Sequence, residues 1–354
     1  MTPSITDRVR VWERLQRIET RLVQNGARHH RDLANKHLEQ FQIPRQHARL
    51  LARVGSGLPP QEFTAAQYRA RYPFGSPPAI QDAFDALVGD GLCESTGAGY
   101  RWSTRGVAAV SAWIGNMGEM ISRSQPAAID AGDVRRLLQS DREILAAMQR
   151  AARPHGKVVF NLRREGLQPD YLVPQLWHHW QLAWSMIALH EDEEELVRRQ
   201  AGLDPLVWWV RRALWLADRR PWLARARTGA ELARRVVDYC PVQDAEAAVD
   251  RALAELSRRG EVCERDGHYR LSVNGLAATD RDERRIDQGF LSTWPAYDPT
   301  SWRELGELVN RLDQHLDGTA LGTSPAGSPG AQAPAYPDGG PPAAQATGHR
   351  LDRR

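Results

Sequence analysis

The chain has 354 residues, of which 42% are hydrophobic, and its formal net charge is only +3. Such a chain can fill ordinary hydrophobic cores, and it is not basic enough to bind nucleic acid by overall attraction alone. No apolar run reaches the roughly eighteen residues of a membrane helix, and the first residues lack a signal-peptide core, so we expect a cytoplasmic protein without a membrane partner.

The first half is predicted to be mostly helical. Apolar residues recur at intervals of three and four over residues 7–42, which indicates one long amphipathic helix whose weakest point is Asn25-Gly26. Ser76 is a suitable N-cap for a helix that ends at Asp90-Gly91. After the long helix, the predicted elements are short helices at 45–54, 63–72 and 77–90, of which Ser76 caps the third, a two-stranded hairpin at 92–103, and helices at 107–120 and 131–152.

The second half repeats this order of elements. The predicted elements are a long helix at 174–199, shorter helices at 206–216, 229–239 and 245–259, a hairpin after Gly260, and closing helices at 276–291 and 301–316. Between the halves, residues 154–169 are expected to form a linker. Residues 317–354 are dominated by Gly, Pro, Ala, Ser and Thr, a composition that predicts a disordered tail.

The two halves also agree residue by residue around their hairpins. Tyr100-Arg101-Trp102-Ser103-x-x-Gly106 matches Tyr269-Arg270-Leu271-Ser272-x-x-Gly275, and Ala83, Leu87 and Gly91 match Ala252, Leu256 and Gly260 at the same offset. To align Cys93-Glu94 with Cys263-Glu264, a gap of one residue is needed after the glycine. We interpret residues 1–153 and 170–316 as two copies of one unit, because periodicity alone would not produce such a match.

Helices followed by a two-stranded hairpin are the order of a winged helix-turn-helix unit, and these residues resemble the MarR family of transcription regulators. The resemblance covers residues 43–108, where Leu87-x-x-x-Gly91-Leu92-Cys93-Glu94 stands at the end of the recognition helix, and residues 206–280. It implies a mainly α fold with two winged helix-turn-helix units joined by long helices. MarR-type proteins usually dimerise through their first and last helices, so the two copies would pair within one chain as a pseudo-dimer, or with a second chain as a homodimer.

The resemblance further implies a transcription regulator that binds double-stranded DNA through recognition helices at 77–90 and 243–259. The residues expected to contact DNA are Gln81, Arg101, Gln243, Arg251, Arg258, Arg265, His268 and Arg270. The first recognition helix carries Asp82, Asp85 and Asp90 but no cation, whereas the second carries Arg251, Arg258 and Arg259 against Asp244, Glu246, Asp250 and Glu255. Because phosphate contacts need cations, the second copy is the better candidate for DNA contact. The alternative is a tandem winged-helix scaffold that binds a protein partner and does not contact DNA.

Six tryptophans lie close together in the sequence between residues 177 and 215. Packing between the long helix and the short helix that follows explains their spacing. The alternative is a cleft for a small aromatic effector, which MarR-like regulators often bind, with Trp177, Trp180 and Trp184 as ligand-binding residues.

We assign no function to the histidines and acidic residues of the helix at 174–199, or to His30 and His37 in the first half. His179 and His190 are eleven residues apart, about three helical turns, which is too far to share a metal ion, and His30 and His37 are about 10 Å apart. We therefore expect solvated histidines on a polar face and no metal. The acidic run at 191–195, followed by Arg198-Arg199, is expected to be a solvated helix end with i, i+4 pairs.

The cysteines and the absence of catalytic motifs complete the sequence-based expectations. Cys93, Cys240 and Cys263 are odd in number and lack CxxC spacing, and their apolar surroundings predict buried thiols and no disulfide framework. The sequence contains no Gly-rich phosphate loop, GxSxG or HExxH motif. We therefore expect neither enzymatic activity nor a cofactor.

Overall fold

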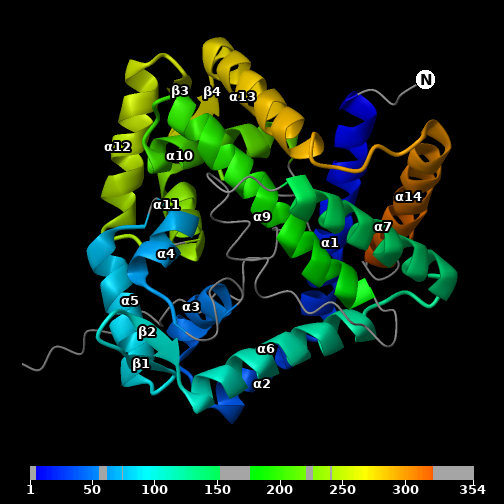
Figure 1. Cartoon of the computed structure of the whole chain (residues 1–354). Coiled ribbons are helices and arrows are strands. Elements are labelled where there is room, and N and C mark those ends of the chain that lie inside the picture. The colour runs from blue at the N-terminus through cyan, green and yellow to red at the C-terminus, as the bar shows by residue number, and fades with distance from the viewer. Residues whose placement is uncertain are drawn as a thin grey trace, which may run out of the picture.

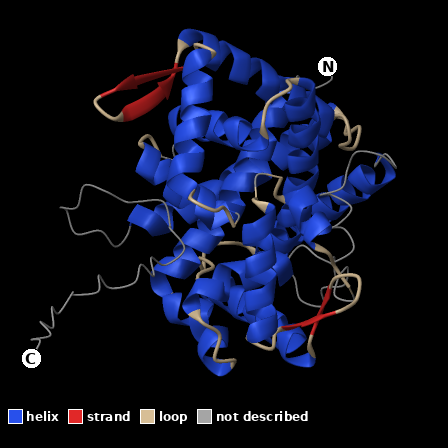
Figure 2. Ribbon diagram, turned by 90° about the vertical axis from the view of Figure 1, so that its left-hand side faces the viewer, coloured by secondary structure: helices blue, strands red, loops and turns tan. Residues whose placement is uncertain are grey.

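The computed structural model describes residues 5–55, 62–73, 75–151, 176–220, 226–239 and 241–321. In this part of the chain the protein is mainly helical, with two small antiparallel sheets of two strands each (Figure 2). The expected linker at 154–169 lies outside the described residues, as do most of the expected tail and Cys240. None of the described helices has the length and apolar character needed to cross a membrane.

The first half contains seven described helices and one hairpin (Figure 1). In chain order they are α1 (Ile5–His29), α2 (Arg31–Gln40), α3 (Arg45–Gly55), α4 (Ala65–Arg71), α5 (Pro77–Gly89), β1 (Cys93–Ser95), β2 (Tyr100–Trp102), α6 (Thr104–Arg123) and α7 (Ala131–Ala151). The predicted long helix divides at His30 and continues through Asn25-Gly26, so the predicted breaking point was wrong. Gly26 serves close packing instead, because a Cβ there would lie 2.9 Å from the Met120 side chain.

The second half has the same general order of elements but, among the described residues, one helix fewer before its hairpin. They are α9 (Leu176–Gln200), α10 (Pro205–Arg219), α11 (Gly229–Tyr239), α12 (Ala245–Arg258), β3 (Val262–Arg265), β4 (His268–Leu271), α13 (Val273–Leu291) and α14 (Pro299–Leu321). The last helix extends beyond the predicted end at Leu316, so the tail does not begin at residue 317. Arg21 of α1 contacts the Asp317 carboxylate at 3.0 Å, which holds this extra turn against the protein.

The two hairpins have matching hydrogen bonds at the turn into the following helix. The Ser103 hydroxyl donates to the Gly91 carbonyl at 2.7 Å and accepts from the Gly106 amide at 3.0 Å. Ser272 makes the equivalent bonds to the Gly260 carbonyl at 2.6 Å and from the Gly275 amide at 3.0 Å. Because Gly91 and Gly260 both have a φ of 68°, the helix before each hairpin ends in the left-handed conformation that glycine favours.

The pairing of the strands corrects the alignment of the cysteines. Cys93 pairs with Trp102, and at the same place in the second hairpin Val262 pairs with Leu271. Cys263 is therefore one residue further along its strand, and the one-residue gap was wrong. Since side chains alternate across a strand, Cys93 is buried and Cys263 is exposed, so a buried thiol is confirmed only for Cys93. Burial raises the pKa of the Cys93 thiol to about 12.

Buried apolar side chains form three clusters. One lies within α2–α6 and the first hairpin, around Phe63 and Phe84, and a second lies within α9–α13 and the second hairpin, around Val249 and Leu256. The largest cluster takes residues from α1, α6, α7, α9, α13 and α14, so both halves build it together. The buried face of α7, which includes Leu137, packs in this cluster.

The halves exchange their outer helices in this shared core. The opening helix α1 of the first half packs along the closing helix α14 of the second, and α9 packs along α7 in the reciprocal way (Figure 1). The Asn25 amide donates to the Leu316 carbonyl at 3.3 Å, and the Asp313 carboxylate pairs with Arg17 at 3.3 Å and with Arg21. The two halves are therefore joined by an extensive buried interface and are not separate globules.

Candidate nucleic-acid interface

The expected recognition helices, α5 and α12, lie along one edge of the protein with their N-terminal ends in contact (Figure 1). The Ser76 amide, just before α5, donates to the Pro241 carbonyl at 3.2 Å. The Gln243 amide, in the turn before α12, donates to the Ser76 hydroxyl at 3.2 Å. The hairpins lie at opposite ends of the molecule (Figure 2).

This contact limits how the two helices could meet DNA. Helix-turn-helix readers contact base edges with the N-terminal residues of the recognition helix, and dimers bind half-sites about 34–36 Å apart. Helices α5 and α12 have 13 and 14 residues and are each about 20 Å long. The N-terminal ends of α5 and α12 lie against each other, because Ser76 is hydrogen-bonded to Pro241 and Gln243. This arrangement does not place the two helices in two successive major grooves.

The exposed face of α5 is acidic, as the sequence indicated. Gln81, Asp82 and Asp85 are exposed on it. The Gln81 amide nitrogen donates to the Asp85 carboxylate at 3.1 Å and to the Tyr100 hydroxyl, so its N–H groups are already engaged within the protein. This face therefore offers two carboxylates and a bonded amide to a partner.

The exposed residues of α12 include arginines as well as the acids Glu246 and Asp250. Arg251 and Arg258 are exposed and seven residues apart, which places them on the same side of the helix. The small exposed side chain of Ala254 lies between them. Arg258 pairs with Glu255 but is still 75% exposed, so its guanidinium remains accessible to a partner. Gln243 is also exposed, at the N-terminal end next to Ser76.

The hairpins provide equivalent arginines with different neighbours. Arg101 lies opposite Glu94 in the first hairpin and pairs with it at 2.7 Å. Arg270 has the same position in the second hairpin, but it lies opposite Cys263, and among the described residues it has no acidic partner. The nearby Arg265 is 94% exposed beside Asp266, and the exposed His268 ring contacts the Asp266 carbonyl at 3.0 Å.

The structure thus divides the expected DNA-contacting residues into two groups. Helix α12 contacts strand β3, so the cations of α12 and of the second hairpin belong to one end of the molecule; these are Arg251, Arg258, Arg265, His268 and Arg270. Gln81 and Arg101 belong to the first half. Gln243 lies between the groups.

The three tryptophans expected to bind an effector lie in the shared core. Trp180 is buried, and its ring centroid is 5.1 Å from that of Trp184 and 6.2 Å from that of Trp113. The Trp184 indole donates to Glu19 at 3.1 Å. Trp177 and Trp184 are partly buried, and neither lines the hollow beside Arg69 or the hollow beside Trp208 and Trp209. An effector site at these tryptophans remains a prediction, while packing explains their positions.

The histidines of α9 are buried, so the expectation of a solvated polar face was wrong. His179 is fully buried, and its Nδ1 lies 2.7 Å from the fully buried Asp141 carboxylate of α7. His178 and His190 are also buried, and burial lowers the pKa of His178 to about 4. The cause is the exchange of helices: α9 is surrounded by α1, α6, α7 and α13, so its residues up to Arg198 are buried or partly buried.

The acidic run at 191–195 is likewise not a solvated helix end. Glu194 pairs with Arg212 at 2.6 Å and accepts a hydrogen bond from Trp208 at 2.7 Å, and burial raises the pKa of this carboxyl. Arg212 also pairs with the buried Glu283 of α13 at 2.7 Å. Only Glu195 makes the expected pairs along the helix, with Arg198 and Arg199.

Sequence reasoning missed this buried ionic network. The sequence signal for this network was the pair Arg211-Arg212 within the mostly apolar helix α10, because arginines at such positions need acidic partners.

Among the described residues, no group of histidine, cysteine and carboxylate side chains could hold a metal ion. The sequence matches no family model, and neither curated proteins nor solved structures contain a match for the chain.

Proposed function

We propose that the chain is a DNA-binding transcription regulator of winged-helix type whose two halves pair as an intramolecular dimer. Three helices followed by a hairpin occur in each half, and the matching bonds of Ser103 and Ser272 support descent from one unit. The reciprocal packing of α1 with α14 and of α9 with α7 supports pairing through the first and last helices.

We further propose that the second half makes the DNA contact, at a single major groove. The observation that carries this proposal is the accessible cation set of α12 and its hairpin. Arg251 and Arg258 flank the small Ala254 on one helix face, and Arg270 has no acidic partner among the described residues. In the first half, the equivalent of Arg270 is neutralised by Glu94, and the exposed face of α5 is acidic. Duplex affinity depends on cations that reach phosphates, so the halves would contribute unequally.

The experiment compares two arginines at equivalent positions. Fluorescence anisotropy would follow full-length protein binding to labelled duplexes that the wild-type protein selects from a random pool, over a range of salt concentrations. Arg270→Ala should lower the slope of log affinity against log salt by about 0.9, as expected for one lost phosphate contact. The double substitution Arg251→Ala/Arg258→Ala should weaken the binding of the selected duplexes by about ten-fold or more.

Arg101→Ala is the matched control, because Arg101 has the same place in the other hairpin but is paired with Glu94. Its affinity and salt slope should equal those of the wild-type protein. Equal losses in Arg101→Ala and Arg270→Ala would contradict the assignment to the second half. An absence of duplex binding even at low salt would contradict DNA binding itself.

A protein-binding scaffold is the second candidate, and the acidic face of α5 favours it. Asp82 and Asp85 are exposed there, and the adjoining end of the helix is held by the turn before α12. Such a face suits a basic protein surface better than a phosphate backbone. Cross-linking of the protein in its host, compared with Asp82→Lys/Asp85→Lys, would test it: a partner captured by the wild-type protein should be lost in the variant, and an unchanged capture would contradict this use of α5.

A further inference from the structure

Two exposed helix faces of opposite charge lie on different halves of the chain. One is the face of α5 that carries Asp82 and Asp85, and the other is the outward face of α13, which carries Arg281 and Arg284. Figure 1 shows α5 and α13 far apart, with α13 running from the second hairpin toward α1. The two faces of one chain therefore do not meet.

The outward face of α13 is basic because the acids of this helix are held by its neighbour α10. These acids are bound by α10 side chains, Asp280 by Trp215, Asp282 by Arg211 and Glu283 by Arg212. Arg281 and Arg284 are exposed, and neither forms an ion pair with a described residue. Two guanidinium groups on one helix face are therefore available to a partner.

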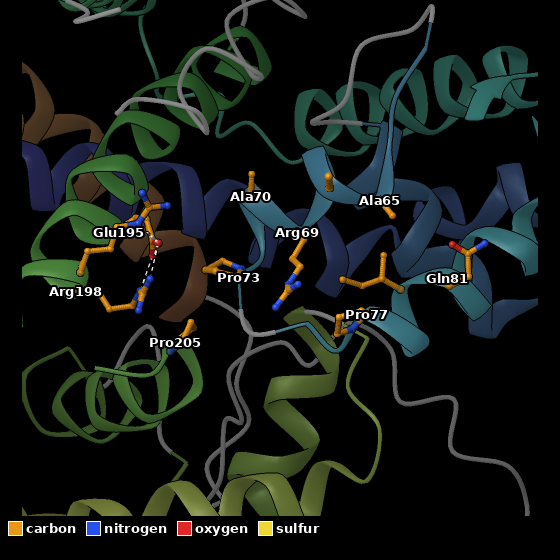
Figure 3. Close-up of a pocket in the computed structure, with 12 residues that line it drawn as sticks. Ala65, Arg69, Ala70, Pro73, Pro77, Gln81, Glu195, Arg198 and Pro205 are labelled. Carbon is orange, nitrogen blue, oxygen red and sulfur yellow. Dashed lines mark hydrogen bonds and ion pairs between the residues drawn. The ribbon is translucent and has the colours of Figure 1, made fainter. Parts of the chain in front are cut away.

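The acidic face of α5 is likewise not neutralised within the described part of the chain. Asp82 and Asp85 are exposed, and neither pairs with a cation there. Figure 3 shows Gln81 of α5 on the far side of a hollow from Arg198, whose guanidinium binds Glu195 of its own helix at 2.6 Å. The α5 carboxylates are therefore available to cations from outside the chain.

The two faces have the same spacing of exposed side chains. On α5 these are Pro78, Asp82, Asp85 and Gly89, and on α13 they are Ala277, Arg281, Arg284 and Gln288. In both sets the intervals are four, three and four residues, which places the two charges about 4.5 Å apart along each helix axis. Because these intervals read the same in either direction, both ion pairs can form whether the two helices run parallel or antiparallel.

Small and apolar residues beside the charges favour a protein surface as the partner. A Cβ at Gly89 would meet no atom within 4 Å, so the end of α5 is open to close approach. On α13, Val273 is 86% exposed one turn before the exposed Ala277. A protein surface would remove these apolar side chains from water, whereas a phosphate backbone would not.

Comparison of the halves shows that each charged face occurs once. In the alignment set by the hairpins, the counterparts of Arg281 and Arg284 in α6 are Ala112 and Gly115, and those of Asp82 and Asp85 in α12 are Arg251 and Ala254. Neither counterpart helix repeats the charge pattern. Each chain thus presents one acidic and one basic face, which suits a head-to-tail contact between copies.

We infer that the acidic face of α5 docks on the basic face of α13 in a second copy of the chain, with Asp82 and Asp85 paired to Arg281 and Arg284. Carboxylates and guanidinium groups form strong charge-assisted hydrogen bonds. Because the contact joins two different surfaces, a pair of chains keeps one face of each kind free for further copies. The contact is separate from the packing of α1 with α14 and does not depend on whether the chain binds DNA.

Sedimentation velocity of the full-length protein without DNA tests the inference. At low salt the mean sedimentation coefficient of the wild-type protein should rise with protein concentration. At about 1 M salt, where the Debye length is about 3 Å, it should stay at the value of a single chain, because exposed ion pairs are weak and screened.

Two charge-reversal variants locate the contact. Arg281→Glu/Arg284→Glu and Asp82→Lys/Asp85→Lys should each weaken association at low salt by at least about ten-fold, since each places like charges opposite one another. Arg135→Glu/Arg303→Glu is the matched control, because it makes the same change of charge at exposed residues of α7 and α14. This control should associate as the wild-type protein does.

Mixing the two charge-reversal variants separates a lost contact from a damaged fold. One variant has two acidic faces and the other has two basic faces, so each alone should sediment as a single chain, while an equimolar mixture should associate. The inference is overturned if the wild-type protein does not associate at low salt at concentrations up to about 1 mM. It is also overturned if either variant associates as the wild-type protein does, or if the mixture associates no more than the separate variants.

Discussion

Replacing Asp141 with asparagine tests the pairing of the two halves at a fully buried point. The Asp141 carboxylate of α7 lies 2.7 Å from Nδ1 of His179 on α9, and neither side chain is exposed. Nε2 of His179 lies 3.3 Å from the Leu15 carbonyl of α1. Both ring nitrogens thus face acceptors, and the ring can donate to both only when it is protonated.

The pKa of His179 determines how this pair depends on pH. Burial alone lowers it, but the Asp141 carboxylate, with smaller help from the Leu15 carbonyl, outweighs burial and raises the pKa above its usual value of 6.5. The contribution of the pair to stability is therefore fully present below about pH 6.5, the unfolded value, and is lost as the pH rises through the raised pKa. Removing one partner of a buried ion pair lowers the free energy of unfolding by about 3–5 kcal/mol. We therefore expect Asp141→Asn to be less stable than the wild-type protein by about this amount at pH 6.

Urea unfolding at pH 6 and at pH 9 measures the effect as a shift of the midpoint at unchanged m. The difference between the wild-type protein and Asp141→Asn should be smaller at pH 9. Asp133→Asn on the same helix is the control, because the arginines that pair with Asp133, Arg136 and Arg311, are 67% and 44% exposed, and its cost should be under about 1 kcal/mol. A loss under about 1 kcal/mol for Asp141→Asn, or a difference that grows with pH, would refute the reasoning.

Two further predictions concern the hairpin turn and the buried network. Gly275→Ala places a Cβ 1.9 Å from the Glu261 carbonyl oxygen and should lower the free energy of unfolding by at least about 1–3 kcal/mol. Gly115→Ala is the control, because its Cβ would meet no atom within 4 Å, and it should stabilise the protein by about 0.5–1 kcal/mol. Equal melting temperatures of the two variants would contradict this. Arg212→Met leaves the Glu194 and Glu283 carboxylates without their cation and should lower the free energy of unfolding, measured in urea, by about 3–5 kcal/mol. A loss within about 1 kcal/mol would show that the network does not contribute to stability.

Local pattern was sufficient to predict most elements of the fold. The predicted helix at 229–239 agrees with α11 at both ends, and both hairpins were placed correctly. Helix caps, periodicity and glycine turns act between residues close in sequence, so the chain carries their signal directly. The acidic face of α5 followed from the sequence for the same reason.

Tertiary structure alone decided the surroundings of α9. The sequence predicted solvated histidines and acids there, because polar residues on a helix usually face water. The exchange of outer helices between the halves instead buries or partly buries α9 as far as Arg198, and partners distant in sequence, Asp141 for His179 and Arg212 for Glu194, compensate the loss of solvation. No local pattern specifies such partners, since they become neighbours only when the two halves pack together. A hollow that α4 and α5 line together with the end of α9 arises in the same way, from surfaces that are more than a hundred residues apart in the chain.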